Sequence, residues 1–242
     1  MQDYFDSLDG FPKRGSKEEY SFYFEKCYDN TLARNAYIQK RVANVEPTRG
    51  HLCLANLFIN NEVKNIWTTN FDVLIEAGIP QYSFNVVSSI QKDSISQIAN
   101  NNFQNVIKLH GDYRYDSIQN TEQELQNLEN QLSDLFYQNL MNSGLVVIGY
   151  AGNDDSVMKV LESNIDNKDF LSKGIYWCKL QNTTLSERAT AFMEKACQNN
   201  DLSCVIDIDG FNEFLNSIST NYEHKNPIID DRWKDFANRK NN

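Results

Sequence analysis

The segments IWTTNFD at positions 66–72, KLHGD at 108–112 and VIGYAGND at 147–154 decide the fold of this chain. Each begins at the end of an apolar run that is typical of a buried β-strand, and each continues into small or polar residues. Helical patterns separate the predicted strands, which favours the α/β class with a doubly wound parallel sheet. In such a sheet the carboxyl ends of the strands share one edge, where ligands bind. We therefore expect the three segments to border one site.

The same patterns predict the limits of the individual elements. Strands are expected at 63–69, 82–87, 103–109, 144–150, 174–180 and 203–208. Helices are expected at 19–27, 32–45, 48–60, 121–141, 156–165, 185–198 and 211–218. Thr48 is a suitable N-cap for the third helix, whose Leu52, Ala55 and Phe58 should face inward. The strand at 144–150 is nearly all apolar, so we expect helices to cover both of its faces.

Composition narrows the possible partners. The chain has 242 residues, 40% of them hydrophobic, and a formal net charge of −10. Phosphate contacts need clustered Lys and Arg, so this charge argues against direct binding of nucleic acid. No apolar run approaches about 18 residues, and the residues from Met1 to Tyr4 do not resemble a signal peptide, so we expect a cytoplasmic protein without a membrane partner. The five cysteines include no C-x-x-C pair, which favours reduced core thiols and no structural zinc site.

Two side chains that could perform chemistry, Asn70 and His110, follow the first and third predicted strands. An amide can donate and accept hydrogen bonds without carrying charge, and an imidazole can take up a proton near physiological pH. Together they could hold a ribose, position water and accept a proton during cleavage through an oxocarbenium-like state. Structural roles are equally open: Asn is common at strand ends, a lone His is more often structural, and Asp72 suits a cap for a helix starting at Val73.

Taken together and in this order, the three segments resemble the sirtuin family, over roughly residues 19–219. More narrowly they resemble its bacterial sirtuin-like branch, whose members hydrolyse NAD. The resemblance implies a Rossmann-like fold, with Asn70 and His110 as catalytic residues. It also implies which residues contact NAD: Thr68, Thr69, Phe71 and Asp72 near the nicotinamide ribose, Gly111 beside the catalytic histidine, and Gly149, Tyr150, Gly152 and Asp154 at the adenosine half. His51 and His224 receive no role from it.

The chain departs from the sirtuin pattern in two places. Sirtuins open with a Gly-Ala-Gly loop that cradles the pyrophosphate, and no such string occurs here. We therefore expect residues 1–224 to form an N-terminally incomplete sirtuin-like domain that lacks the first Gly-rich strand and loop, followed by a polar extension or linker at 225–242. The four-cysteine zinc module of the deacylating sirtuins is also missing, and residues 121–141 occupy its place. This disfavours a deacylase and favours the zinc-free branch, which acts in anti-phage defence.

The leading hypothesis is an NAD hydrolase that depletes NAD, with NAD as substrate and no metal. Because uncontrolled loss of NAD is toxic, we expect activity to depend on a homo-oligomer or on an activating partner. An NAD-dependent protein deacylase or ADP-ribosyl transferase is one alternative. A non-catalytic assembly or binding module with the same fold is the other, and the missing phosphate loop favours it.

Overall fold

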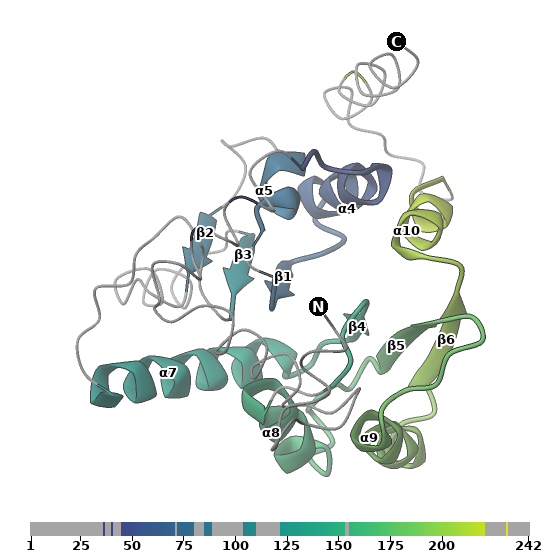
Figure 1. Ribbon diagram of the computed structural model, residues 1–242. Helices are drawn as coiled ribbons and strands as arrows, with labels where there is room; N and C mark the ends of the chain where they lie inside the picture. The colour runs from purple at the N-terminus through teal and green to yellow at the C-terminus, as the bar shows by residue number, and fades with distance from the viewer. Residues whose placement is uncertain are drawn as a thin grey trace, which may run out of the picture. The chain divides into compact units, whose positions relative to one another are not determined.

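The computed structural model describes residues 45–70, 72–79, 85–88, 104–109, 122–152 and 155–220, together with Ala36, Lys40 and Asp231 (Figure 1). The chain divides into two compact units, Met1–Val45 and Glu46–Asn242. The helices predicted at 19–27 and 32–45 lie outside the described residues, except that Ala36 and Lys40 are helical. Everything that follows concerns the second unit.

Strands and helices alternate through the second unit in the predicted order. The elements are α4 (Arg49–Ile59), β1 (Asn65–Thr68), α5 (Leu74–Gly78), β2 (Asn85–Ser88), β3 (Asn105–Lys108), α7 (Glu122–Leu140), β4 (Leu145–Val147), α8 (Asp155–Asn164), β5 (Ile175–Leu180), α9 (Glu187–Asn199), β6 (Cys204–Ile208) and α10 (Phe211–Thr220). All six predicted strands are present, each shorter than its apolar run. The run overestimates the strand because the apolar pattern continues past the residues that pair in the ladder.

The strands form two three-stranded sheets, in the orders β1-β3-β2 and β4-β5-β6, and every pairing is parallel. In the first sheet Thr68 is in register with Lys108, so β1 and β3 end side by side. In the second sheet Val147 is in register with Trp177. Parallel strands that end in register place the residues following them at one edge.

Helices cover both faces of the first sheet. Because side chains alternate along a strand, neighbouring residues of β1 and β3 face opposite layers. Ile66 and Val106 pack against α4, in one cluster with Leu52, Ala55 and Phe58, as the sequence predicts. Ile107 packs with Leu132 and Leu135 of α7, and Trp67 packs against the same cluster. The core of this sheet therefore lies in two layers, one on each side.

Helices cover one face of the second sheet and only part of the other. Val147, Ile175 and Trp177 share a cluster with buried residues of α8 and α9, such as Met158 and Phe192. On the other side Leu215 of α10 is buried with two residues of α4, and Ile148 packs against them. The first turn of α4 is also bonded to α10, because Gly50 N–H and Thr48 Oγ1 both donate to Asn212 Oδ1, at 2.9 and 2.6 Å. The predicted α/β class with doubly wound parallel strands is confirmed.

Two detailed predictions are wrong. Val146 of β4 is 51% exposed, although β4 was expected to be covered on both faces. It lies in register with half-buried Tyr176, which is in register with exposed Cys204, so no helix of the described residues covers this row. Not every thiol is in the core: Cys53 and Cys178 are buried, whereas Cys197 and Cys204 are exposed, and all four are free.

No helix in the described part is long and apolar enough to cross a membrane.

Candidate functional site

The turn after β1 is shaped by hydrogen bonds from its own side chains. Thr68 is buried, and its Oγ1 accepts a hydrogen bond from Asn70 N–H at 3.0 Å. The Asp72 carboxylate accepts one from Leu74 N–H at 3.0 Å, two residues along the chain. Asp72 was expected to cap a helix starting at Val73, but α5 starts at Leu74 and its N-cap is Val73, so the capping prediction is wrong. Thr69 is half-buried between Thr68 and Asp72, and Asn70 is exposed. The chain is thus held on both sides of an amide that faces solvent.

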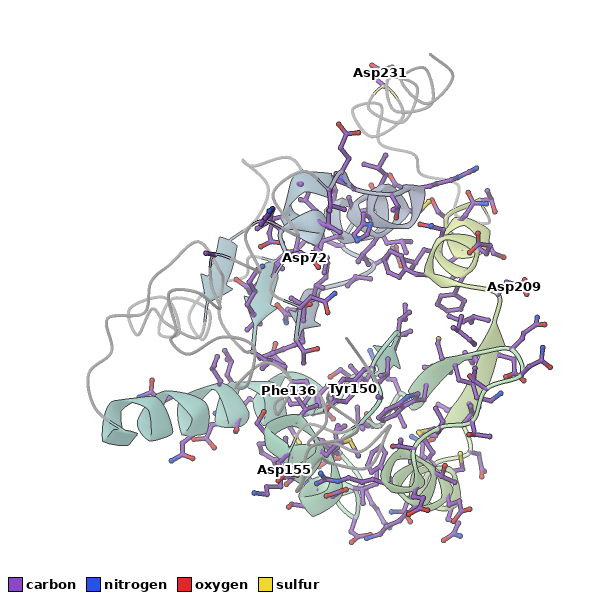
Figure 2. All side chains as sticks on the ribbon, in the orientation of Figure 1. Asp72, Phe136, Tyr150, Asp155, Asp209 and Asp231 are labelled. Atoms are coloured by element: carbon purple, nitrogen blue, oxygen red, sulfur yellow. The ribbon has the colours of Figure 1, made fainter. Side chains whose placement is uncertain are left out.

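The end of β3 is fastened to this turn at two points. Leu109 N–H donates to Thr68 C=O at 2.9 Å, which continues the ladder between the strands. Lys108 Nζ donates to Asp72 C=O and lies 3.2 Å from Glu76 Oε1 in α5. Lys108 is 0% exposed and Glu76 8%, so this is a buried ion pair. Asp72 lies directly after the β1 turn (Figure 2).

Four of the predicted site residues, Phe71, His110, Gly111 and Asp154, lie outside the described residues. The structure therefore describes Asn70 but not its proposed catalytic partner. It does show that the chain entering position 110 is bonded to the Asn70 turn, through Lys108 and Leu109.

The glycine turn after β4 needs its glycines for two different reasons. Gly149 and Gly152 have φ of +68° and +75°, in the left-handed region that side chains disfavour. A Cβ on Gly152 would lie 3.1 Å from Ala189 Cβ, whereas a Cβ on Gly149 would meet none of the described residues within 4 Å. Tyr150 packs on Trp177, with ring centroids 5.9 Å apart, and joins the same cluster as Leu109 (Figure 2). The positive φ accounts for a glycine at both positions, and close packing against α9 is a second reason at Gly152 only.

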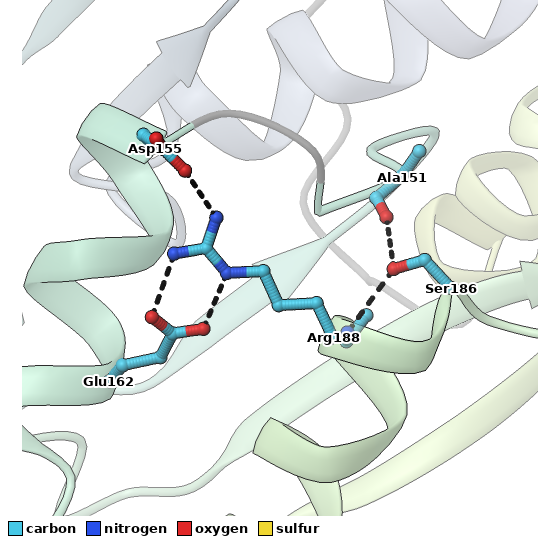
Figure 3. Close-up of polar contacts among 6 residues, drawn as sticks. Ala151, Asp155, Glu162, Ser186 and Arg188 are labelled. Atoms are coloured by element: carbon cyan, nitrogen blue, oxygen red, sulfur yellow. Dashed lines mark hydrogen bonds and ion pairs between the residues drawn. The ribbon is translucent and has the colours of Figure 1, made fainter. Parts of the chain in front are cut away.

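Residues at the start of α9 hold this turn and the adjoining helix (Figure 3). Ser186 Oγ donates to Ala151 C=O at 2.8 Å and accepts from Ala189 N–H at 3.2 Å, so the N-cap of α9 is also a tether. Arg188 grips Glu162 of α8 through two hydrogen bonds of 2.6 and 2.8 Å, and Asp155 at 2.6 Å. The hydrogen bond from Arg188 lowers the pKa of Glu162. The hydrogen bonds to Glu162 and Asp155 raise the pKa of Arg188.

His51 lies in the first turn of α4, and the Asp72 carboxylate in the β1 turn interacts with it electrostatically. Its Nδ1 accepts a hydrogen bond from Thr48 N–H at 3.1 Å, which completes a capping box and confirms Thr48 as the N-cap. Its ring lies 4.9 Å from that of Phe211. Burial lowers the pKa of His51, and the Asp72 carboxylate partly opposes this shift. His51 therefore has a structural role at the start of α4.

Sequence reasoning missed four residues that shape the site: Lys108, Glu76, Ser186 and Arg188. Only Lys108 gives a local signal, a cation inside the apolar run from Val106 to Leu109. Its partners come from another element, so periodicity cannot identify them. In the described part of the chain, no group of three or more His, Cys, Asp or Glu side chains could hold a metal ion.

Two uncharged positions stand out among the described residues: the Asn70 side chain is exposed at one strand end, and near another a Cβ on Gly149 would meet no described residue within 4 Å. No curated protein matches the chain. The family model of the SIR2-like domain matches residues 64–199, which is more than half of the chain and includes both of these positions. SIR2-like domains bind NAD. The chain belongs to the SIR2-like domain family.

Proposed function

We propose that this protein hydrolyses NAD at the bond between nicotinamide and ribose. Family membership supplies the ligand class, and the exposed amide of Asn70, held at the end of β1, is the observation that carries the proposal. Thr68, Thr69, Phe71 and Asp72 would line the ribose side with Gly111. Gly149, Tyr150, Gly152 and Asp154 would contact the adenosine half.

The proposed reaction needs little from the protein beyond positioning. The C–N bond to nicotinamide breaks with its electron pair going to the pyridine nitrogen, so the leaving group departs neutral without needing an acid. The oxygen of water forms the new bond to the sugar carbon, and a proton of that water passes to His110 and then to solvent. The products are ADP-ribose, nicotinamide and a proton. The Asn70 amide would hold the ribose and orient the water, because it can donate and accept at once.

An enzyme that destroys NAD suits a bacterial defence in which an infected cell stops supporting the phage. Such an activity must be silent before infection, so we propose that a homo-oligomer or an activating partner controls it in the cytoplasm. Residues 1–224 would form the NAD-binding domain, and the polar residues 225–242 would lead to the controlling part. Release of nicotinamide that rises steeply with protein concentration would support control by self-assembly.

The test is nicotinamide release from NAD by the full chain and by Asn70→Ala and His110→Ala. Each substitution should lower the rate roughly 100-fold or more, because it removes a group that orients or deprotonates water. His224→Ala is the matched control, since it lies outside the family match and should leave the rate unchanged.

The products separate the competing functions. Equimolar ADP-ribose and nicotinamide support hydrolysis. Turnover that requires an acyl-lysine peptide would indicate a deacylase, and label from NAD fixed on protein would indicate a transferase. Full activity in both variants would disprove the assigned residues, and NAD binding without any turnover would indicate a binding module.

A further inference from the structure

We infer that Lys108 is a positioning residue that holds the Asn70 turn in place for catalysis, by linking the end of β3 to Asp72 and Glu76. This inference rests on the proposed function, because it assigns the device that sets the geometry of that same site. Lys108 does not touch the proposed substrate; it acts through the backbone of the turn.

The contacts place Asn70 between two fastenings. On the amino-terminal side, Thr68 C=O is bound by Leu109 N–H. On the carboxyl-terminal side, Asp72 C=O is bound by the ammonium of Lys108. Both fastenings come from consecutive residues of one strand end, so the turn moves with β3. The same two residues directly precede His110 in the sequence.

The burial of the pair favours positioning over stability. Lys108 is fully buried, and the Glu76 carboxylate is only 8% exposed. Desolvating two charges costs about as much as their attraction returns, so apolar residues of the same size would stabilise this position equally well. An ammonium can do what an apolar side chain cannot: its several donors hold a carboxylate and a main-chain carbonyl at once. The contact that only Lys108 can make is therefore the one to the Asp72 carbonyl.

A loose turn would be costly for the reaction, because misplacement of a catalytic group by about 1 Å can lower a rate 100-fold. The exposed side chain of Asn70 cannot be held by packing, so its position depends on the backbone that carries it. The restraint matters more for the rate of the bound complex than for binding, since most NAD contacts are assigned elsewhere.

The test compares four forms of the full chain: wild type, Lys108→Met, Glu76→Gln and the double variant. The double variant has no buried charge left unpaired, so its melting temperature should return to within a few degrees of wild type. It still lacks the link to Asp72. We expect its kcat for nicotinamide release to fall roughly 10- to 100-fold with KM within about threefold of wild type. Hydrogen exchange of the peptide covering 69–79 should be faster than in wild type.

The matched control is Lys179→Met with Asp207→Asn, which removes another strand-borne Lys–carboxylate pair, between β5 and β6. It should leave kcat and the exchange of 69–79 unchanged. A stable double variant of Lys108 and Glu76 with wild-type kcat would overturn the inference. If wild type itself releases no nicotinamide, the proposed function fails. In that case hydrogen exchange of residues 69–79 still tests the positioning role of Lys108. Equal exchange in wild type and the double variant would overturn it, and faster exchange in the double variant would support it.

Discussion

The ammonium nitrogen of Lys108 lies 3.2 Å from a carboxylate oxygen of Glu76, with both side chains buried. The pair joins the last residue of β3 to α5, the short helix that follows the Asn70 turn. It therefore connects the helix after the turn to the strand that pairs with β1, through two buried charges. Removing one charge or both has opposite consequences for stability.

Lys108→Met alone should lower the free energy of unfolding by about 3–5 kcal/mol, because it leaves the Glu76 carboxylate buried without its counter-charge. Adding Glu76→Gln should restore most of that loss, since the carboxylate is then neutral. Urea unfolding of the single and double variants near neutral pH measures both steps. A double variant no more stable than Lys108→Met would show that the loss comes from packing and not from charge.

The two glycines of the β4 turn should respond differently to alanine. Gly149→Ala should cost about 1 kcal/mol, because its φ of +68° is unfavourable and its Cβ would meet none of the described residues within 4 Å. Gly152→Ala should cost more, since its Cβ also lies 3.1 Å from Ala189 Cβ. Urea unfolding gives the order of stability. Calorimetry should then show weaker NAD binding for Gly149→Ala despite its smaller loss of stability, because its methyl group would stand at the proposed contact with the adenosine half. Unchanged binding would remove Gly149 from the proposed contact.

The buried imidazole of His51 should make stability depend on pH. Burial lowers its pKa in the folded state below the ordinary value of 6.5, so the unfolded chain binds the proton more readily. The free energy of unfolding should therefore fall as the pH drops below about 6.5, and level off once the pH is below the folded-state pKa. His51→Gln keeps the capping box of α4 but cannot titrate.

The comparison is urea unfolding at about pH 5.5 and about pH 8 for wild type and His51→Gln. The variant should lose less stability than wild type on going to the lower pH. Equal losses in the two proteins would assign the pH dependence to other groups.

Arg188 should contribute modestly and in a salt-dependent way. Arg188→Met removes the contacts to Glu162 and Asp155. Arg188 is 31% exposed, Glu162 37% and Asp155 52%, so the free energy of unfolding should fall by no more than about 1 kcal/mol. Arg188 lowers the pKa of Glu162, so its contribution is present above the ordinary pKa of 4.5 and disappears as the pH falls through the lower, folded-state value.

Thermal and urea unfolding at low and high salt, and across this acidic range, measure the effect. Lys195→Met is the control, because its partner Asp166 is exposed and its removal should change stability less. A difference between wild type and Arg188→Met that persists in strong acid would show that the arginine acts through packing of its aliphatic stem.

Much of the fold could be predicted because apolar periodicity is a local property. The inward positions of α4, the Thr48 cap and the strands ending near Thr68 and Lys108 all follow from residue patterns over a few turns or strand positions. The same reasoning failed for Val146, because an apolar strand residue indicates which face could be covered and not whether a helix reaches it. The three segments predict where the candidate site lies, but the contacts that hold these segments could not be predicted from them.

The sequence by itself determined the order of strands and helices, the α/β class and the segments that place the chain in its family, since each depends on residues close together in the chain. Only the tertiary structure decided that Lys108 is buried against Glu76 and bonded to Asp72, and that Ser186 is bonded to Ala151. These contacts join separate elements. A buried charge or hydroxyl takes whichever partner the packing of those elements brings within hydrogen-bonding distance, and no local pattern specifies that partner.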